Sequence, residues 1–378
     1  MKVCIAIDSL KGSLTTFEAG ESAKEGILRA CPDAVVDVRP MADGGEGTME
    51  ALTRALGGET VEATVCGPLG SPVTARYGIS GTTALMEMAQ ASGITLVSRD
   101  ELDPMAATTY GVGQMIVDAI NRGCRSFVMG IGGSATNDGG MGMLQALGVR
   151  FVDENGLTLP CRGDSLGNVK TIDISGVLPQ LYECEFSIAC DVKNPLCGDN
   201  GCSAIFGPQK GLGDRQVPLM DSWLGEYSKL VQSILPHADP CAPGAGAAGG
   251  LGFALMAFCR ARLRSGIDLV MDATDLEEHI KAADLVITGE GKLDKQSCMG
   301  KAPSGVARLS KKHGKLCIAL CGAADEDARS CNERGINAYF PILRTPCSLD
   351  DAMDKKTAKA NMAAAAEQVM RLVLAVKS

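Results

Sequence analysis

The chain has 378 residues, more than one ordinary hydrophobic core accommodates, so its length predicts two domains. The composition is that of a soluble globular protein, and the net charge of −9 disfavours non-specific binding to nucleic acid. No apolar run approaches the roughly 18–20 residues that a membrane-spanning helix needs. The sequence begins directly with a predicted strand, so we expect no signal peptide and a cytoplasmic protein without a membrane partner.

The sixteen cysteines follow no metal-binding pattern. Several lie inside apolar runs, as Cys4, Cys190 and Cys317 do, and no two are spaced Cys-x-x-Cys. The three histidines are scattered and lie outside the glycine-rich loops, which argues against a zinc site and against a Ser–His or Cys–His hydrolase. Reduced thiols in a cytosolic enzyme are the simplest interpretation.

Short strands and helices alternate near both ends of the chain, which predicts a doubly wound parallel sheet with helices on its faces. The expected strands are 3–7, 34–39, 285–288, 316–321 and 337–340. The expected helices are 15–30, 46–56, 304–312 and segments within 349–376.

The middle of the chain has a different pattern, which predicts a mixed α/β domain with its own core. Residues 61–79 are typical of a hairpin. Further strands are expected at 126–130, 150–152 and 185–190, and helices at 108–121, after Gly139, at 217–235 and at 251–262. We therefore predict an α/β fold in which a mixed α/β domain, 65–270, is inserted into a doubly wound domain made of 1–64 and 271–378.

The segment Asp8-Ser-Leu-Lys-Gly-Ser13 follows the first strand and leads into the first helix. In an open α/β sheet, ligands lie beyond the carboxyl ends of the strands. Lys11 is suited there to neutralising a phosphate or carboxylate, and the amides at a helix N-terminus attract an anion. A solvated turn that ends in a helix cap is the alternative.

Three further segments place acidic side chains just after predicted strands, two of them among glycines, and each alone is also compatible with an ordinary turn. They are Pro40-Met-Ala-Asp-Gly-Gly-Glu-Gly-Thr48, Cys190-Asp-Val-Lys-Asn194 and Gly289-Glu-Gly-Lys-Leu-Asp294. Their carboxylates, among them Asp43, Glu46 and Asp191, suit Mg2+. Phosphoryl transfer needs metal ligands, cations on the phosphate oxygens and a carboxylate that accepts the hydroxyl proton.

Two glycine-rich runs bear on phosphate binding. Ile131-Gly-Gly-Ser-Ala-Thr-Asn-Asp-Gly-Gly140 follows a predicted strand and offers hydroxyl, amide and carboxylate groups to phosphate oxygens or a metal. Gly244-Ala-Gly-Ala-Ala-Gly249 spells a dinucleotide fingerprint, but prolines and not a strand precede it, so we reject that function. A helix N-terminus and close helix packing remain open for this run. No P-loop motif occurs in the sequence.

At these motifs the sequence resembles the bacterial type I glycerate kinase family. The segments that carry the resemblance are 8–13, 41–48, 130–140, 190–195, 206–211, 243–252 and 287–294. They span nearly the whole chain in the order of the family. The family often has proline and phenylalanine where this chain has Ile7 and Leu10, and both differences keep the positions apolar.

The resemblance implies a flavodoxin-like domain that carries an inserted restriction-endonuclease-like domain. It also implies ATP-dependent, Mg2+-requiring phosphorylation of D-glycerate, with 2-phosphoglycerate favoured over 3-phosphoglycerate. A kinase for another small hydroxy acid and a non-catalytic anion-binding protein are the alternatives, and an NAD-dependent dehydrogenase ranks below them. The expected partners are D-glycerate and ATP, and homo-oligomerisation stays open.

Roles at the site follow from the motifs and the resemblance together. The catalytic candidates are Lys11, Asp43, Glu46 and Asp191, of which Asp43 and Asp191 are also metal candidates. The substrate-binding candidates are Asp8, Ser9, Lys11, Lys193, Asn194, Lys292 and Asp294. The nucleotide-binding candidates are Gly132, Gly133, Ser134, Thr136, Asn137, Asp138 and Glu290.

Overall fold

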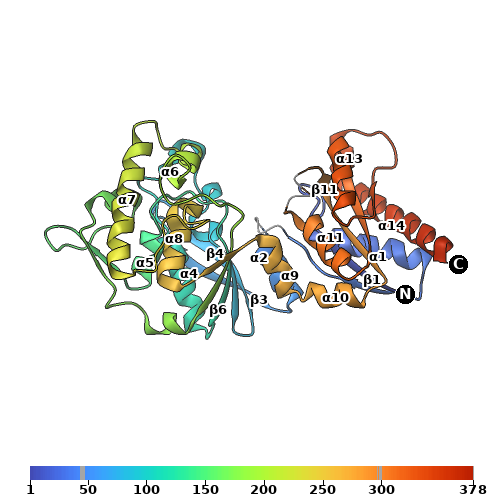
Figure 1. Cartoon of the computed structure of the whole chain (residues 1–378), viewed down its shortest axis with the longest axis horizontal. Helices are drawn as coiled ribbons and strands as arrows, with labels where there is room; N and C mark the ends of the chain where they lie inside the picture. The colour runs from blue at the N-terminus through green and yellow to red at the C-terminus, as the bar shows by residue number, and fades with distance from the viewer. Residues whose placement is uncertain (43–46, 296, 298–299, 378) are drawn as a thin grey trace. The chain divides into compact units, whose positions relative to one another are not determined.

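The computed structural model describes residues 1–42, 47–295, 297 and 300–377, and the chain forms two compact units (Figure 1). The first unit consists of residues 1–43 and 267–378, and the second consists of residues 44–266. The predicted boundary at residue 64 lies inside a strand, Glu59–Cys66, that pairs within the second unit. The observed division near residue 44 keeps the whole strand in the same unit as its partner, Pro72–Ser80. The predicted boundary would have divided the strand between two domains.

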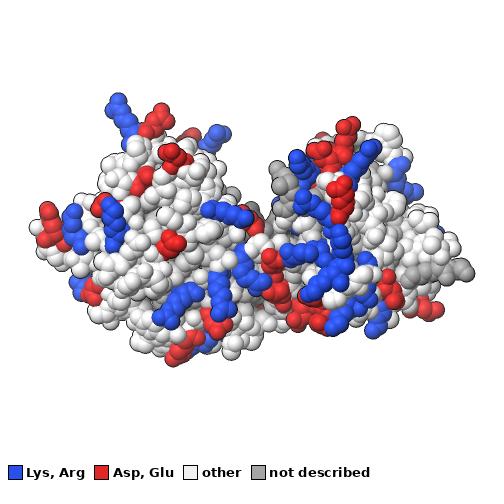
Figure 2. Space-filling model, viewed as in Figure 1, with Lys and Arg blue, Asp and Glu red and all other residues white. Residues whose placement is uncertain are grey.

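The surface of the chain carries charges of both signs. Figure 2 shows lysine and arginine side chains interspersed with aspartate and glutamate on the visible face. Ion pairs such as Arg308–Asp268 and Lys312–Glu277 are examples of this arrangement. No helix in the described part of the chain is long and apolar enough to cross a membrane.

The first unit is built on a five-stranded, all-parallel sheet with the order β13-β12-β11-β1-β2. The strands are β1 (Lys2–Ile7), β2 (Val35–Val38), β11 (Leu285–Leu293), β12 (Leu316–Ala324) and β13 (Ala338–Pro341). The predicted parallel sheet is therefore confirmed. We expected β11 to end at Thr288, but it continues to Leu293 because Gly289 lets it approach β12 closely. A Cβ at Gly289 would lie 1.8 Å from the carbonyl oxygen of Leu320.

Helices cover both faces of this sheet. The helices are α1 (Thr16–Ala30), α9 (Gly266–Ala273), α10 (Leu276–Ala282), α11 (Ala302–Lys312), α12 (Ser330–Glu333), α13 (Leu349–Met353) and α14 (Lys355–Lys377). Ile5, Ile287 and Ile318 point to one face, where they form a core with α1 and α14. Because side chains alternate along a strand, their neighbours point to the opposite face, on which α10 and α11 contact the strands.

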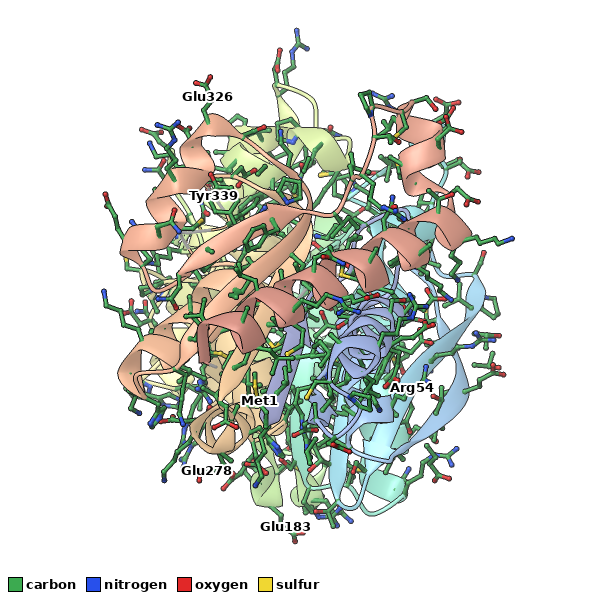
Figure 3. All side chains as sticks on the ribbon, turned by 90° about the vertical axis from the view of Figure 1, so that its right-hand side faces the viewer. Met1, Arg54, Glu183, Glu278, Glu326 and Tyr339 are labelled. Carbon is green, nitrogen blue, oxygen red and sulfur yellow. The ribbon has the colours of Figure 1, made fainter. Side chains whose placement is uncertain are left out.

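Helices α1 and α14 lie side by side across the sheet, as the end-on view of this unit shows (Figure 3). Gly26 of α1 allows this contact, since a Cβ there would lie 1.9 Å from the carbonyl oxygen of Ala363. Glu18 of α1 also pairs with Lys355 and Lys359 of α14. This packing holds the helix that follows the Asp8–Ser13 segment against the sheet.

The second unit contains a six-stranded mixed sheet with the order β10-β9-β6-β5-β4-β3. Its strands are β3 (Glu59–Cys66), β4 (Pro72–Ser80), β5 (Thr83–Glu87), β6 (Ser126–Gly130), β9 (Glu185–Ala189) and β10 (Arg262–Arg264). Strands β3, β4 and β5 pair antiparallel, and β5, β6, β9 and β10 pair parallel. A separate antiparallel pair consists of β7 (Arg150–Val152) and β8 (Thr171–Asp173).

The helices of the second unit enclose a core of its own. They are α2 (Thr48–Ala55), α3 (Ala89–Ser92), α4 (Tyr110–Asn121), α5 (Met141–Ala146), α6 (Cys202–Phe206), α7 (Gln216–Ile234) and α8 (Ala247–Cys259). The expected hairpin, mixed sheet and helices are thus present, and the chain has a mixed α/β fold with one parallel and one mixed sheet.

The cysteines mostly behave as small apolar residues. Of the cysteines that the structure describes, fourteen carry free thiols, and Cys4, Cys202, Cys259, Cys317 and Cys321 are among those that are buried. Burial raises the pKa of the Cys4 and Cys317 thiols to about 12, so they stay protonated at neutral pH. Cys331 is disulfide-bonded, so the expectation of reduced thiols was wrong at this residue.

Candidate functional site

The segment after β1 forms a closed turn at the carboxyl end of the sheet. Leu10 and Leu14 exchange two backbone hydrogen bonds, and Gly12 takes a φ of +81° at the tip. The Thr16 hydroxyl donates to the carbonyl oxygen of Ile7, which fixes the start of α1 against the end of β1. Asp8 is buried, and its Oδ1 accepts a hydrogen bond of 2.7 Å from the amide of Ser9. The predicted loop is therefore a rigid turn that presents its side chains beyond the strand.

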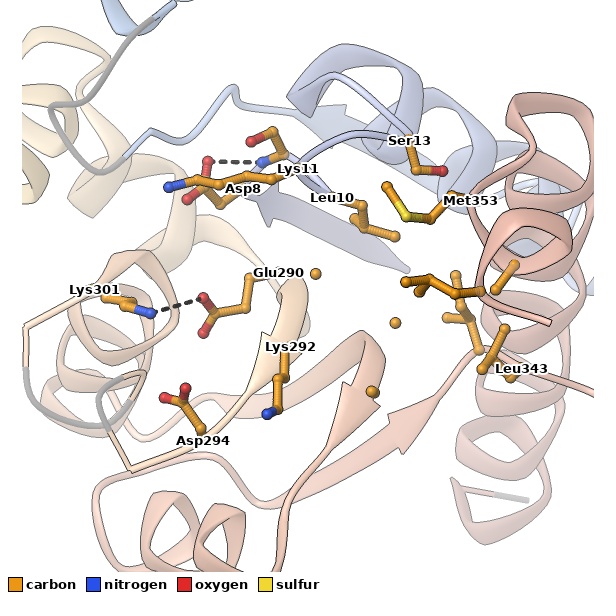
Figure 4. A pocket seen from close by; sticks show the side chains of 17 residues that line it. Asp8, Leu10, Lys11, Ser13, Glu290, Lys292, Asp294, Lys301, Leu343 and Met353 are labelled. Atoms are coloured by element: carbon orange, nitrogen blue, oxygen red, sulfur yellow. Dashed lines mark hydrogen bonds and ion pairs between the residues drawn. The ribbon is translucent and has the colours of Figure 1, made fainter. Parts of the chain in front are cut away.

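This turn lines a cavity of about 370 Å3, called here the strand-end cavity. Its lining combines residues of the turn, of β11, of the end of β12 and of α13. They are Asp8, Ser9, Leu10, Lys11, Ser13, Glu290, Gly291, Lys292, Asp294, Lys301, Gly322, Ala323, Ile342, Leu343, Leu349, Ala352 and Met353. In Figure 4 the charged side chains gather at one end of the cavity and the apolar side chains at the other. Six of the predicted site residues are thus brought together.

Glu290 is, with Asp8, one of the buried carboxylates that line the cavity. It is buried, and its Oε1 has no hydrogen-bond partner among the described residues. Its Oε2 lies 4.0 Å from Nζ of Lys301. Burial raises the pKa of this carboxyl group, and Ser297 and Lys301 act in the opposite direction. A buried acceptor without a partner is costly unless a ligand satisfies it.

Lys292 and Asp294 lie at the rim of the cavity and have partners within the protein. Nζ of Lys292 is 2.9 Å from Oδ2 of Asp325, and this hydrogen bond raises the pKa of Lys292. Asp294 closes a turn with Ser297, whose amide donates to Asp294 Oδ1 over 2.9 Å. Because both side chains already have partners within the protein, we expect Lys292 and Asp294 to play only a supporting part in binding a ligand at the rim of the cavity.

Sequence reasoning missed several residues of the cavity. Lys301 immediately precedes α11, and Ser13 ends the turn with a buried hydroxyl that has no hydrogen-bond partner among the described residues. Leu343, Leu349 and Met353 come from the segment between β13 and α14. Ser13 belongs to a motif that was recognised, so its place next to Lys11 was a usable signal. The α13 residues carry no sequence signal, because only the chain path brings them to this edge.

The remaining candidates that the structure describes lie in the second unit, after the carboxyl ends of its parallel strands. Glu87, Gly130 and Ala189 end β5, β6 and β9, and the register places them side by side. The 131–138 loop and Asp191 therefore start from the same edge of this sheet. Glu87, which the sequence did not single out, accepts a hydrogen bond of 3.1 Å from the amide of Met49 at the start of α2.

The polar side chains of the 131–138 loop point into the protein. Ser134, Thr136, Asn137 and Asp138 are all buried, whereas Gly132 and Gly133 are exposed. Asp138 accepts hydrogen bonds from the amides of Thr109, Gly140 and Gly142 and from the Thr109 hydroxyl. Burial raises the pKa of the Asp138 carboxyl group. The four hydrogen bonds lower this pKa, but their effect is smaller than that of burial. The side chain thus fixes the loop to the starts of α4 and α5.

Lys210 holds the same loop from the other side and was not singled out as a site residue. This buried lysine donates to Ser134 Oγ over 2.6 Å and to the carbonyl oxygen of Thr136 over 2.7 Å. Burial lowers the pKa of Lys210 to about 8, and the nearby Cys202 and Asp138 act in the opposite direction. Its position in the quoted 206–211 motif was the available signal.

The glycine run that we rejected as a dinucleotide fingerprint packs against this loop. Gly249 has a φ of +67°, and a Cβ there would lie 2.2 Å from the carbonyl oxygen of Thr136. The carbonyl oxygen of Gly249 accepts a hydrogen bond of 2.9 Å from the amide of Gly139. Both interpretations left open are present, because the run packs closely on the loop and Gly246 is the N-cap of α8.

Asp191, Lys193 and Asn194 follow β9. Asp191 is exposed, and its Oδ1 accepts a hydrogen bond of 3.1 Å from the amide of Gly266. Lys193 is also exposed, while the Asn194 side chain donates to the carbonyl oxygen of Asn200 over 2.8 Å. Asp191 thus presents a carboxylate to solvent at the end of a parallel strand.

Two catalytic candidates, Asp43 and Glu46, lie outside the described residues. Among the residues that the structure describes, no group of three or more His, Cys, Asp or Glu side chains is placed to hold a metal ion alone. Mg2+ in phosphoryl-transfer enzymes commonly uses one or two carboxylates together with phosphate oxygens, so its ligand set includes the substrate. Glu290, with its unpartnered oxygen, fits that requirement.

The fold and the strand-end cavity define an α/β protein of the class that binds small charged ligands beyond the carboxyl ends of parallel strands. The family model of the glycerate kinase family matches residues 3–374. The chain belongs to the glycerate kinase family, and it is a kinase enzyme.

Individual relatives cover almost the whole chain. Glycerate 2-kinase of Escherichia coli K12 is 47% identical over 355 residues, which are 93% of each protein. Glycerate kinase of Haemophilus influenzae is 43% identical over 379 residues, with both chains fully covered. A crystal structure from Salmonella typhimurium LT2, provisionally named glycerate kinase 2, superposes with a TM-score of 0.92 at 43% identity, over 100% of this chain and 99% of that one.

Proposed function

We propose that this kinase transfers the terminal phosphoryl group of ATP to D-glycerate, with Mg2+, in the cytoplasm. Membership of the glycerate kinase family over residues 3–374 is the observation that carries the proposal. We further propose the 2-hydroxyl group as the acceptor, so that the product is 2-phosphoglycerate. The name of the Escherichia coli relative, glycerate 2-kinase, supports this choice.

We assign the two units to separate domains. In the first unit, numbering the strands by their order within that unit gives the sheet order 2-1-3-4-5, which is the flavodoxin-like order. This order supports a flavodoxin-like domain. The restriction-endonuclease-like character of the second domain is proposed from the family resemblance.

In the reaction, the glycerate hydroxyl oxygen forms a bond to the γ-phosphorus of ATP as the bond to the bridging oxygen breaks and ADP leaves. The hydroxyl proton passes to a carboxylate, and Asp191, exposed at the end of β9, is the acceptor that we propose. Lys11, exposed on the turn after β1, is proposed to neutralise charge on the transferred phosphoryl group.

Glu290 is the residue that we propose to hold Mg2+, with Asp8 or Asp294 assisting from the same cavity. When bound, the metal supplies charge neutralisation on the phosphate oxygens. The Asp43 and Asp191 metal roles remain predictions. The nucleotide-binding roles of Ser134, Thr136, Asn137 and Asp138 remain predictions, and the exposed backbone of Gly132 and Gly133 is the part of this loop that we propose as a contact for an anion.

The partners that we propose are small molecules, D-glycerate and ATP, without nucleic acid or membrane. The net charge of −9 and the interspersed surface charges support this proposal (Figure 2). Whether the chain forms a homo-oligomer remains open.

Release of ADP, measured with ATP, Mg2+ and a panel of hydroxy acids, tests the proposed function. We expect D-glycerate to have the highest kcat/KM, with L-glycerate, glycolate and lactate at least about tenfold lower, since each lacks a contact or presents it wrongly. A higher value for another acid would assign a different substrate. ADP release that no acid stimulates would contradict kinase activity on this class of compound.

A further inference from the structure

The two ends of the strand-end cavity differ in chemistry, and we propose that its apolar end binds the purine ring of the phosphoryl donor. The donor nucleotide then occupies the first unit, and its phosphates point to the charged end of the cavity. This inference rests on the proposed function, because it assigns a place to one substrate of that reaction.

The apolar end has more hydrophobic surface than a small hydroxy acid can use. Leu10, Leu343 and Met353 lie at this end (Figure 4), and Ile342, next to Leu343, and Leu349, one helical turn before Met353, also line the cavity. Glycerate carries a hydroxyl or carboxylate group on every carbon, so an apolar wall contributes nothing to its binding. A flat aromatic ring gains free energy there by leaving water and by contacting the leucine and methionine side chains. The chemistry of the wall therefore favours a nucleobase.

Ser13 lines the cavity and contributes a hydroxyl group close to its apolar end (Figure 4). The Ser13 hydroxyl is buried and makes no hydrogen bond among the described residues. Figure 4 places Ser13 beside Met353 and Leu10. A ring nitrogen, an exocyclic amine or a ribose hydroxyl would satisfy it, and one well-placed polar group in an apolar pocket is the usual means of fixing a ligand's orientation.

The opposite end has the charges that a polyphosphate and its metal require. Lys11 and Lys301 supply cationic groups there, and Glu290 supplies the oxygen without a partner. The volume of about 370 Å3 lies at the lower end of the range of roughly 300–1,000 Å3 that is typical of sites for molecules of this size. An amphiphilic ligand, apolar at one end and anionic at the other, matches the cavity along its length.

The topology of the sheet supports the same position. β1 and β11 are neighbours in the sheet, yet the strand that follows β1 is β2 on one side and the strand that follows β11 is β12 on the other. The chain therefore turns in opposite directions from these two strands, and their carboxyl ends form the switch point where open α/β sheets bind ligands. Asp8 and Glu290, which line the cavity, come from this point.

The test measures ADP binding by titration calorimetry without glycerate, on the full-length protein. Leu349→Asp places a charge on the apolar wall, and because Leu349 is 72% exposed the substitution removes little buried packing. Ser13→Ala removes the hydroxyl alone. Leu372→Asp, on a 55% exposed leucine of α14 that does not line the cavity, is the matched control. Thermal unfolding of each variant shows whether it is folded.

We expect Leu349→Asp to weaken ADP binding by about tenfold or more and Ser13→Ala by roughly three- to tenfold, the scale of one lost hydrogen bond. Leu372→Asp should bind ADP as the wild type does, and KM for glycerate should stay within about twofold in all three variants. Unchanged ADP affinity in both cavity variants overturns the inference. A rise in KM for glycerate with unchanged ADP affinity also overturns it, since the cavity would then hold the acid.

Failure of the purine subsite and failure of the proposed function can be told apart in these experiments. If the wild type shows no glycerate-dependent turnover, that function is wrong, whatever the variants do. If the wild type phosphorylates glycerate but both cavity variants bind ADP normally, only the purine subsite is wrong.

Discussion

Lys301 Nζ lies 4.0 Å from Glu290 Oε2, while Glu290 Oε1 has no hydrogen-bond partner among the described residues. One oxygen of this buried carboxylate is thus close to a cation, and the side chain lines a cavity that contains further charged groups (Figure 4). Structural ion pairs normally satisfy both oxygens of a buried carboxylate. This arrangement therefore indicates that Glu290 is kept for a ligand.

Replacing Glu290 by glutamine should reduce activity without reducing stability. The amide keeps the shape of the side chain but removes the charge that burial disfavours, as the raised pKa shows. We expect kcat to fall by at least about 100-fold, the scale of a lost electrostatic contribution, and Tm to stay equal or rise. Steady-state kinetics and calorimetry of the same preparation measure both. An active variant, or an inactive one with a much lower Tm, contradicts this role.

Replacing Lys11 by alanine should impair turnover with little effect on the fold. The side chain is exposed on the turn after β1, so its removal costs almost no packing. We expect turnover to fall by at least about 100-fold, because a cation on the transferred phosphoryl group is lost. Lys24→Ala, on the following helix and outside the cavity, is the control and should keep wild-type kinetics. Near-normal turnover in Lys11→Ala would remove this residue from the site.

Replacing Asp191 by asparagine tests the proton acceptor. Asparagine still accepts the hydrogen bond from the Gly266 amide, so the loop is preserved while the basic group is lost. The expected decrease in kcat is at least about 100-fold, at the lower end of what a general base contributes. Asp214→Asn, on an exposed aspartate of the same unit, should be unaffected. If kcat of Asp191→Asn stays within a fewfold of wild type, another carboxylate accepts the proton.

Glu18 makes stability depend on acid pH. Partial burial opposes its ionisation, but hydrogen bonds from Lys355, Lys359 and Thr15 lower its pKa to about 2, from 4.5. A carboxylate with a lowered pKa contributes stability above about pH 4.5 and loses it as the pH falls towards 2. Because the pairs are solvated, Glu18→Gln should cost only about 0.5–1 kcal/mol at pH 7.

Urea unfolding at pH 7, 5 and 3.5 measures this difference. The stabilities of wild type and Glu18→Gln should converge as the pH falls. Glu21→Gln, on the same helix with one exposed lysine partner, should show a smaller difference at pH 7. A wild-type advantage that is constant with pH would show that the ionised form of Glu18 is not the source.

Gly26→Ala should destabilise the first unit. The added Cβ would lie 1.9 Å from the carbonyl oxygen of Ala363, so α1 and α14 must separate. We expect a loss of roughly 1–3 kcal/mol, typical of overpacking. Gly225→Ala in α7, where no atom lies within 4 Å of the added Cβ, should be neutral or stabilising. Equal Tm values for the two variants would contradict the close contact between α1 and α14.

The sequence predicted the parallel sheet correctly, because β-rich apolar runs such as 3–7 and 316–321 alternate with amphipathic helices. The prediction from the sequence was less successful in glycine-rich runs, because glycine is compatible both with a loop and with closely packed regular structure. The run 289–293 looked like a loop but continues β11, since glycine also permits close strand pairing. The run 244–249 also had two interpretations, and both hold, because it forms the N-terminus of α8 and packs on the 131–138 loop.

Part of the candidate site was predictable for a simple reason. Asp8, Lys11 and Glu290 belong to parallel strands or to the turns at their ends, and such ends meet at one edge of the sheet. Leu349 and Met353 were not predictable, because their place depends on the path of the chain after β13 and not on their own pattern. Lys210 was missed although it lies in the quoted 206–211 motif, because only a tertiary contact brings it to Ser134.

Phosphorus NMR of a reaction that contains D-glycerate, ATP and Mg2+ tests the central proposal most directly. The account predicts that the γ-phosphate signal disappears while ADP and one phosphomonoester appear in equal amounts, and that the phosphorus couples to the single proton on C2. A phosphomonoester coupled to the two C3 protons would contradict the choice of hydroxyl group. ATP that stays intact, or that yields only inorganic phosphate, would contradict glycerate phosphorylation itself.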